Sequence, residues 1–224
     1  MGKTILTPKQ LKFLELAEKN RQITSRFYLT GGTVLSEFYL RHRLSEDLDL
    51  FSEEEVKPEM VEAFLKKISP KLKVSKIIKE HYLGLFSYKL FYSKTKYLKV
   101  DFNFYPFPRI EKGKRFGNLE INSIYDIVVN KIHTIAMRTI ARDFVDIYFI
   151  LRETEYNDLE KIRLDSQAKF DWPLEPKNLI SQFLKVKDIQ DKDYPKMLRP
   201  FNRKEMEDFF LGLAKSLEKE IFVE

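Results

Sequence analysis

The residue types best suited to chemistry lie between positions 31 and 49, where a double glycine and a pair of alternating aspartates flank one short expected helix. Side chains alternate between the two faces of an extended segment, so Asp47 and Asp49 should point the same way while Leu48 and Leu50 turn into the core. Two parallel carboxylates at one strand end suit a metal ion, and hard oxygen ligands of this kind suit Mg²⁺ supplemented by water and substrate phosphate. The spacing therefore favours magnesium and nucleotide phosphates as ligands.

A third aspartate, Asp101, stands between Val100 and Phe102 in an apolar segment. A buried carboxylate is costly, so this one requires a compensating partner. If its strand neighbours the strand that carries Asp49, all three acids converge, and two Mg²⁺ ions about 4 Å apart would stabilise the attacking and leaving oxygens of phosphoryl transfer. We therefore expect Asp47, Asp49 and Asp101 to ligate the metal.

The double glycine, Gly31 and Gly32, opens the expected helix. Two residues without a Cβ let the chain turn sharply, and their amides and the helix N-terminus would suit a triphosphate. A D-x-D pair alone is more often a turn or a helix cap. The combination of a double glycine, an acidic pair and a lone aspartate on a later strand favours the functional interpretation over the structural one.

A basic stripe is predicted further along the chain, because Lys131, Arg138 and Arg142 fall at offsets of seven and eleven on an apolar helical segment. Three aligned cations would neutralise phosphate oxygens, with Asp146 at the edge of the stripe. The alternatives are a solvated charged face, or Asp143 and Asp146 holding Arg142 and Arg138 in place.

The composition narrows the class of protein. The 224 residues are 43% hydrophobic and 33% charged, which indicates a folded chain. Cysteine is absent, which excludes disulfides, thiolate zinc sites and cysteine nucleophiles. We find neither a signal peptide nor a spanning apolar run, so we expect a cytoplasmic protein with no membrane partner. The net charge of +6 gives a weak preference for nucleic acid.

Two further sets of residues are better explained by a structural role than by a functional one. Lysines gather in one short region, and exposed helix and strand faces explain them better than a binding surface: Lys66, Lys67, Lys71, Lys73, Lys76 and Lys79. The histidines, His42, His81 and His133, share no metal-ligand spacing, so we interpret them as packing or surface residues.

The hydrophobic periodicity predicts an α+β chain, with a strand-rich first half and a helix-rich second half, as two closely packed domains. Strands are expected around residues 27–30, 48–51, 73–79, 84–92, 97–104 and 119–121. Helices are expected at residues 8–20, 33–41, 54–68, 155–163, 176–186 and 203–220, with one from 125 to 152 that is either continuous or broken near 139–143. Thr7 and Asn202 are predicted helix caps. We place the domain boundary between residues 117 and 118.

The same segments resemble a known family, the AbiE-type (AbiEii-like) abortive-infection toxin nucleotidyltransferases of the DNA polymerase β-like superfamily. The resemblance spans roughly residues 25 to 152, and no motif in the last seventy residues matches. Three segments carry it: the glycines through R-L-S-E-D-L-D at 43–49, D-x-x-x-x-K-I-H-T-I-A-M-R at 126–138, and R-D-F-V-D-I-Y at 142–148.

The resemblance implies a nucleotidyltransferase-type mixed β-sheet with flanking helices, followed by a C-terminal helical domain. It also implies roles for particular residues. Asp47 and Asp49 would ligate Mg²⁺, Asp101 matches the third carboxylate of the superfamily, and Ser45 would hold phosphate with the glycines. Thr33 stands where serine is frequent and keeps the hydroxyl. Lys131 would neutralise the triphosphate, and Asp146 would orient a cation or activate the acceptor hydroxyl. The domain of residues 118–224 would thus contribute Lys131, Arg138 and Asp146 to the cleft of a catalytic domain of residues 1–117.

The implied activity is magnesium-dependent transfer of a nucleotide from an NTP to an acceptor hydroxyl, with RNA (the tRNA 3′ end) as the expected acceptor. Family members act as toxins restrained by an antitoxin, here expected to be a winged-helix protein. Two alternatives stay open from the sequence: the acceptor is a small molecule or a protein, or the chain is a non-catalytic interaction module. Which NTP is used does not follow from these motifs.

Overall fold

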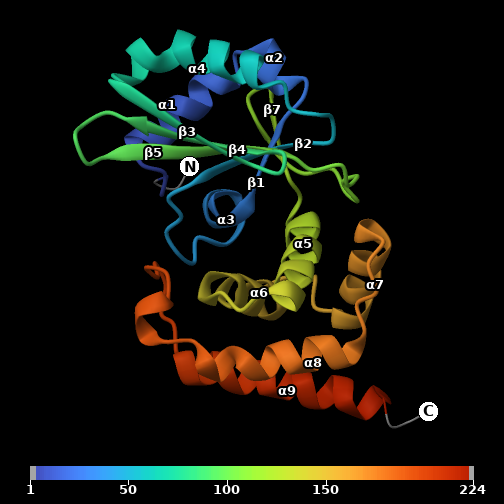
Figure 1. The fold of residues 1–224 in the computed structure, drawn as a ribbon. Helices are drawn as coiled ribbons and strands as arrows, with labels where there is room; N and C mark the ends of the chain where they lie inside the picture. Colours follow the sequence, from blue (N-terminus) through green and yellow to red (C-terminus); the bar gives the residue numbers. More distant parts are fainter. Residues whose placement is uncertain (1–3, 222–224) are drawn as a thin grey trace. The chain divides into compact units, whose positions relative to one another are not determined.

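The computed structural model describes residues 4–221, and these divide into two compact units (Figure 1). The first unit comprises Met1–Tyr39 and Ser45–Ile124, and the second comprises Leu40–Leu44 and Tyr125–Glu224. The division lies a few residues beyond position 117 because the strand at 119–121 pairs within the sheet of the first unit. The short segment Leu40–Leu44 was not expected to belong to the second unit. The chain passes from the first unit into the second at Leu40 and returns to the first at Ser45.

The first unit is built on a seven-stranded mixed sheet in the order β3-β4-β5-β2-β1-β7-β6. The strands are β1 (Tyr28–Thr30), β2 (Leu48–Ser52), β3 (Lys76–Tyr82), β4 (Leu85–Phe91), β5 (Tyr97–Phe104), β6 (Arg115–Phe116) and β7 (Leu119–Ile121). Strand β2 runs parallel to β5 and antiparallel to β1, while β1 runs parallel to β7. The predicted α+β class with a mixed sheet is confirmed.

One face of this sheet forms the core of the first unit. Leu48 and Leu50 on β2, and Val100 and Phe102 on β5, are fully buried there. Three helices lie on one side of the sheet in Figure 1: α1 (Pro8–Ala17), α2 (Arg21–Thr24) and α4 (Pro58–Leu72). Because side chains alternate along a strand, the residues between these apolar positions point to the opposite face.

Helix ends in the first unit follow local chemistry. Thr7 caps α1 in a capping box, as predicted. Helix α4 begins at Pro58 rather than near residue 54, because proline is favoured in the first turn. It ends at Lys73 in the left-handed conformation, where the Val74 N–H donates to the Ser69 carbonyl, so β3 starts at residue 76 and not at 73.

The helix after the double glycine also differs from the prediction. Instead of a helix over residues 33–41, α3 (Gly31–Val34) begins at the glycine itself and continues as a π-helical segment, Leu35–Leu40. The segment stops at Arg41, whose φ of 54° is in the left-handed region. The chain then enters the second unit.

The second unit is helical. Its helices are α5 (Ile124–Met137), α6 (Ala141–Glu153), α7 (Leu159–Phe170), α8 (Pro176–Leu184) and α9 (Arg203–Ile221). The predicted helix from residue 125 to 152 is broken after Met137, which confirms the second of the two alternatives. Asp158 caps α7 and so delays its start relative to the predicted residue 155, while the predicted cap Asn202 accepts the Lys204 N–H at 2.9 Å.

Aromatic contacts hold the core of the second unit together. The Phe210 ring lies 4.9 Å from Phe144 and 5.2 Å from Phe183, which joins α6, α8 and α9. Arg43 of the returning segment forms a β-bridge with Met197. Within residues 4–221, none of the helices has both the length and the apolar character needed to cross a membrane.

Candidate active-site residues

The carboxylates of the first unit lie on neighbouring strands. Asp49 on β2 is directly opposite Asp101 on the parallel strand β5. Asp47 and Asp49 are partly exposed, whereas Leu48 and Leu50 are fully buried, which confirms the predicted alternation. Asp101 is 7% exposed, so its charge requires the partner that the sequence led us to expect.

That partner is Lys99, which the sequence analysis missed. Its ammonium lies 2.7 Å from Asp101 Oδ2 and 3.1 Å from Asp47 Oδ2. Burial lowers the pKa of Lys99, but the two aspartates outweigh burial and the pKa is raised, so the side chain stays charged. The Ser87 hydroxyl, on the neighbouring strand β4, donates to Asp101 Oδ1 at 2.6 Å. A signal was available, because Lys99 precedes Asp101 by two residues and therefore shares its face.

These residues match a hard divalent cation in the chemistry of their donors. Asp47, Asp49 and Asp101 supply only carboxylate oxygens, which is the ligand type that Mg²⁺ prefers. Their present arrangement is adapted to the Lys99 ammonium, and in the part of the chain that the structure describes no group of three acidic or histidine side chains has the geometry of a metal site. In this structure the Lys99 ammonium is the cation that pairs with Asp47 and Asp101.

The double glycine positions the acidic pair. Gly31 has φ of 78°, and a Cβ added to it would lie 2.1 Å from Asp49 Oδ2. The Asp49 carboxylate thus packs directly on the glycine backbone, which only glycine permits. The Thr33 hydroxyl donates to the Asp47 carbonyl at 2.5 Å, so Thr33 holds the segment before β2. The carbonyl of Ser45 accepts from the Gln10 side-chain amide at 3.0 Å.

In the second unit, a fully buried carboxylate, Asp146, collects three basic side chains. Arg43 donates to both of its oxygens, at 2.6 and 2.7 Å, and His42 Nε2 lies 2.7 Å from Oδ1. The Lys131 ammonium is 2.7 Å from Oδ2. Burial raises the pKa of Asp146, but Lys131 and Arg43 reverse this and hold it well below its usual range. Asp146 is therefore ionised.

Lys131 is engaged by two acids. Besides Asp146, it pairs with Asp143 at 2.8 Å, and Arg138 lies 3.4 Å from the other Asp143 oxygen. Burial lowers the pKa of Lys131, but Asp146 and Asp143 more than compensate, so its pKa is raised. The predicted stripe on one helical segment is wrong: Lys131 lies on α5, Arg138 in the connection after Met137, and Arg142 on α6.

The alternative pairing was also partly wrong. Asp143 does pair with Arg138, but Asp146 pairs with Arg43 and Lys131. Arg142 is exposed and forms no ion pair within residues 4–221. Arg43 is 103 residues away from Asp146 in sequence, beyond the reach of helical spacing.

The histidines divide into two kinds. His42 is fully buried and hydrogen-bonded to Asp146, so the interpretation as a packing or surface residue missed its polar role. His81 stacks on Phe86 at 4.2 Å and His133 on Phe170 at 4.0 Å, which agrees with packing. Burial lowers the pKa of His133.

Comparison with known proteins decides the family. The sequence profile described as the nucleotidyl transferase AbiEii toxin of a type IV toxin–antitoxin system matches residues 16–215, most of the chain. The chain belongs to the AbiEii nucleotidyltransferase toxin family. The resemblance seen in three short segments is confirmed, and it extends through most of the C-terminal residues that carried no recognisable motif.

Individual proteins are similar to this chain in sequence or in fold. An uncharacterised protein of Aquifex aeolicus is 28% identical over 197 residues, covering 86% of this chain and 88% of its own length. A putative nucleotidyltransferase from Helicobacter pylori shares the fold with a TM-score of 0.58 at 18% identity, covering 96% of this chain and 97% of that one. The nucleotidyltransferase toxin MenT4 from Mycobacterium tuberculosis has a TM-score of 0.56 at 15% identity, covering 94% and 82%.

Family membership fixes the general chemistry. The AbiEii protein is a nucleotidyltransferase, and enzymes of this kind use an NTP substrate and generally a divalent metal. As the toxin of a toxin–antitoxin system it has an antitoxin as partner.

Proposed function

We propose that this AbiEii enzyme is a magnesium-dependent transferase that moves a nucleoside monophosphate from an NTP to a hydroxyl of RNA, at the 3′ end of tRNA. The acceptor oxygen attacks the α-phosphorus in line, the bond from that phosphorus to the bridging oxygen breaks, and pyrophosphate leaves. Catalysis of this kind depends on positioning and on neutralising charge. The observation that carries the proposal is the in-register pair Asp49 and Asp101, joined to Asp47 through Lys99.

Asp47, Asp49 and Asp101 would hold Mg²⁺, which when bound supplies positive charge to the triphosphate oxygens. Gly31 and Gly32 are proposed to present backbone amides to phosphate, together with Ser45. The Thr33 hydroxyl is already donated to the Asp47 carbonyl, so its contribution is to hold the acidic strand in place.

Lys131 and Arg138 are the proposed cations for the triphosphate. Both Asp146 oxygens are occupied by Arg43, His42 and Lys131, and the side chain is fully buried. A carboxylate in that condition does not act as a base toward an acceptor hydroxyl. We therefore assign Asp146 as a positioning residue that acts through Lys131, the first of the two roles expected from the resemblance.

The RNA acceptor is proposed from charge. The chain carries a net charge of +6, which raises the local concentration of polyanions. RNA binding through phosphates should weaken steeply with salt, whereas transfer to a small molecule or to a protein side chain should not. We also propose a DNA-binding winged-helix protein as the antitoxin.

The test is label transfer from α-³²P-NTP to total tRNA by the wild type and by Asp47→Asn. Loss of a metal-ligating charge should reduce labelling by about a hundredfold or more. Asp188→Asn is the matched control, because Asp188 is exposed and lies outside the carboxylate cluster. Labelling by Asp47→Asn equal to that of the control would end the proposal, and label found on protein or small molecules would end the RNA assignment.

A further inference from the structure

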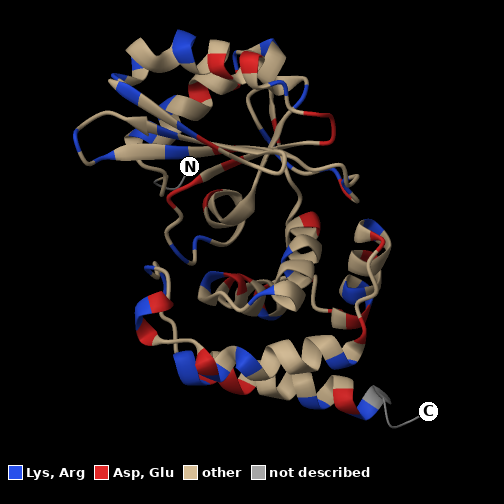
Figure 2. Ribbon diagram, in the orientation of Figure 1, with Lys and Arg blue, Asp and Glu red and all other residues tan. Residues whose placement is uncertain are grey.

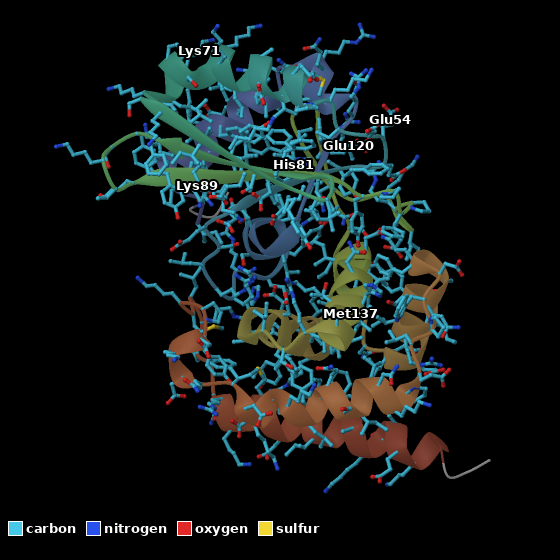
Figure 3. All side chains as sticks on the ribbon, viewed as in Figure 1. Glu54, Lys71, His81, Lys89, Glu120 and Met137 are labelled. Carbon is cyan, nitrogen blue, oxygen red and sulfur yellow. The ribbon has the colours of Figure 1, made fainter. Side chains whose placement is uncertain are left out.

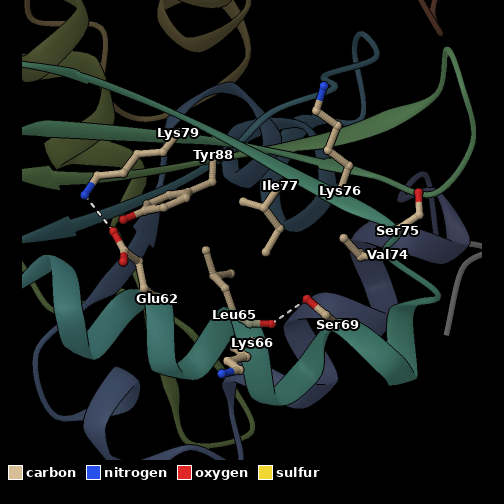
Figure 4. Close-up of a pocket in the computed structure, with 10 residues that line it drawn as sticks. All are labelled: Glu62, Leu65, Lys66, Ser69, Val74, Ser75, Lys76, Ile77, Lys79 and Tyr88. Atoms are coloured by element: carbon tan, nitrogen blue, oxygen red, sulfur yellow. Dashed lines mark hydrogen bonds and ion pairs between the residues drawn. The ribbon is translucent and has the colours of Figure 1, made fainter.

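The face of the sheet that carries the acids continues over β5, β4 and β3. Asp49, Asp101 and Ser87 lie opposite one another on β2, β5 and β4. Helix α4 covers the other face, where Leu65 and the Tyr88 side chain line the space between the helix and the strands (Figure 4). Because successive strand residues point to opposite faces, Ser87 and Tyr88 belong to different faces. The face that carries the acids is therefore not the one that α4 covers.

A row of three side chains crosses this face near the turn between β4 and β5. Lys76 on β3 is opposite Phe91 on β4, which in turn is opposite Tyr97 on β5. Tyr97 precedes Asp101 by four residues, so the two side chains share a face and lie about 13 Å apart along the strand. Figure 4 shows the Lys76 side chain pointing away from α4, as this alternation requires. We call Tyr97, Phe91 and Lys76 the aromatic row.

The aromatic row is accessible and held in place. Tyr97 is 44% exposed, and its ring packs against the Phe91 ring with the two centroids 5.0 Å apart. The turn beside it is ordered by hydrogen bonds, since the Tyr92 N–H donates to the Lys96 carbonyl at 3.1 Å. Lys76 is exposed, and no ion pair holds its ammonium within residues 4–221. One side of the Tyr97 ring is therefore supported while much of the ring stays open to a ligand.

The order of the strands determines the side from which an acceptor approaches. Gly31 follows β1, whose Thr30 is opposite Asp49, and Asp101 lies across β2 from β1. This step rests on the proposed function, in which the glycines hold the triphosphate and pyrophosphate leaves on the β1 side. The attacking and leaving oxygens of an in-line displacement lie on opposite sides of the phosphorus. The acceptor therefore approaches over β5 and β4, where the aromatic row lies.

The chemistry of the aromatic row suits a single-stranded nucleic acid. Aromatic rings stack on bases of any sequence, while cationic side chains contact the phosphates of the strand. Tyr97 and Phe91 supply the rings. Lys89 lies on the same face but pairs with Glu80 at 2.6 Å, so Lys76 is the better placed contact for a phosphate. A paired end would offer no free base to the Tyr97 ring.

We propose that the aromatic row binds the unpaired nucleotides that precede the 3′ end of the RNA acceptor, with a base stacked on Tyr97 and a backbone phosphate at Lys76. The stretch of β5 from Tyr97 to Asp101 then separates the stacked base from the reacting hydroxyl. The surface selects an RNA whose 3′ end is single-stranded over one whose 3′ end is paired.

The test is equilibrium binding of two fluorescein-labelled RNA hairpins to the full chain, measured by fluorescence anisotropy in Mg²⁺ without NTP, so that no transfer takes place. One hairpin has a single-stranded 3′ overhang of a few nucleotides, and the other is blunt. The overhang should strengthen binding by about tenfold, which is the contribution of one stacked base. Equal affinity of the wild type for the two hairpins overturns the proposal.

Variants of Tyr97 locate the stacked base. Tyr97→Ala should remove the advantage of the overhang, whereas Tyr97→Phe should keep it because phenylalanine retains the ring. The matched control is Tyr82→Ala, since Tyr82 is a 73% exposed tyrosine at the other end of β3 from Lys76. If Tyr97→Ala keeps the advantage of the overhang, or if Tyr82→Ala loses as much of it, the assignment is wrong.

The salt dependence of binding tests the phosphate contact. Lys76→Gln should reduce the slope of log affinity against log salt concentration by about 0.7, the share of one phosphate contact with a single strand. Lys66→Gln removes the same charge from an exposed lysine of α4, on the other side of the sheet, and should leave the slope unchanged. Equal slopes for the two variants would contradict the contact at Lys76.

Because these measurements need no turnover, failure of this proposal is distinguishable from failure of the proposed function. Label transfer to tRNA, together with equal affinity for the two hairpins, would leave the transferase standing and remove the acceptor surface. Binding of the overhang that depends on Tyr97, without label transfer to RNA, would support the surface and end the RNA assignment of the transferase.

Discussion

Lys99 offers the sharpest test of the carboxylate cluster. Its ammonium is shared between Asp47 and Asp101, so a divalent cation that binds these acids has to take over the charge that Lys99 now supplies. We predict that Lys99→Met destabilises the metal-free protein and strengthens its binding of Mg²⁺. Methionine keeps the length of the side chain and removes only the charge and the donors.

The magnitude follows from the two contacts. Hydrogen bonds to charged groups contribute about 1.5–3 kcal/mol when well shielded, and less where solvent screens them. The side chains of Lys99 and Asp47 are 29% and 32% exposed, while the side chain of Asp101 is 10% exposed. About 1 kcal/mol for each contact gives about 2 kcal/mol in total. If Mg²⁺ no longer has to displace these two contacts, the affinity of Lys99→Met for Mg²⁺ exceeds that of the wild type by at most about thirtyfold.

The assay is urea unfolding, first in EDTA and then over a series of Mg²⁺ concentrations. A ligand that binds the folded state stabilises it in proportion to RT ln(1 + [L]/Kd), so the midpoint of unfolding reports Kd without any turnover. In EDTA the unfolding midpoint of Lys99→Met should lie below that of the wild type. Each increase in Mg²⁺ concentration should raise the midpoint of Lys99→Met by more than that of the wild type. Loss of transfer activity is not needed as a readout.

Lys89→Met is the matched control. Lys89 lies opposite Lys99 on the neighbouring strand, on the same face of the sheet, but pairs with Glu80 at 2.6 Å. Its loss should leave the Mg²⁺ response unchanged. If Mg²⁺ stabilises both variants equally, or if Lys99→Met is no less stable than the wild type in EDTA, Lys99 is not a stand-in for the metal and the reasoning fails.

Two other substitutions test the supports of the site. Gly31→Ala should lower stability by about 1–3 kcal/mol and reduce activity, because the new Cβ meets Asp49 Oδ2 at 2.1 Å on a residue with φ of 78°. The control is Gly212→Ala, which has no atom near its Cβ and should raise stability by up to about 1 kcal/mol in the same urea unfolding experiment. Asp146→Asn should cost about 3–5 kcal/mol, since it leaves buried Lys131 and its neighbouring cation without their shared charge. The pKa of Asp146 is depressed in the fold, so its contribution to the free energy of unfolding is complete above about pH 4 and is lost as the pH falls. The wild type and Asp146→Asn should therefore become closer in stability in acid. A constant difference between them down to pH 2 would contradict this.

Charged residues are spread over the strands and helices of both units (Figure 2), and side chains of every kind surround them (Figure 3). Part of the candidate site was nevertheless predictable from the sequence. Strand periodicity was enough to put Asp49 and Asp101 on one face of the sheet and Leu48 and Leu50 on the other, in the core. The mixed sheet was expected from the family resemblance, since alternation along a strand does not say whether its neighbours run parallel or antiparallel. The family motifs then supplied the chemistry.

The partners of the charged residues were not predictable in the same way. The contact of Arg43 with Asp146 joins residues 103 apart, and neither helical nor strand spacing carries information over that distance. Some predicted helix and strand boundaries were wrong for local reasons. For example, Lys73 adopts the left-handed conformation usually taken by glycine, so β3 begins later than predicted. The π-helical segment at Leu35–Leu40 has the same apolar pattern as an α-helix and could not be told from one.

The two charged clusters differ in how much of the fold depends on them. Asp146 is fully buried, with both oxygens bonded to cations, so its removal leaves buried positive charges without their partner. Lys99 and Asp47 are partly open to solvent, and a mobile lysine can leave its acids without breaking the sheet. Substitutions around Asp146 should therefore reduce folding and activity together, whereas substitutions at Lys99 should change metal affinity in a protein that stays folded.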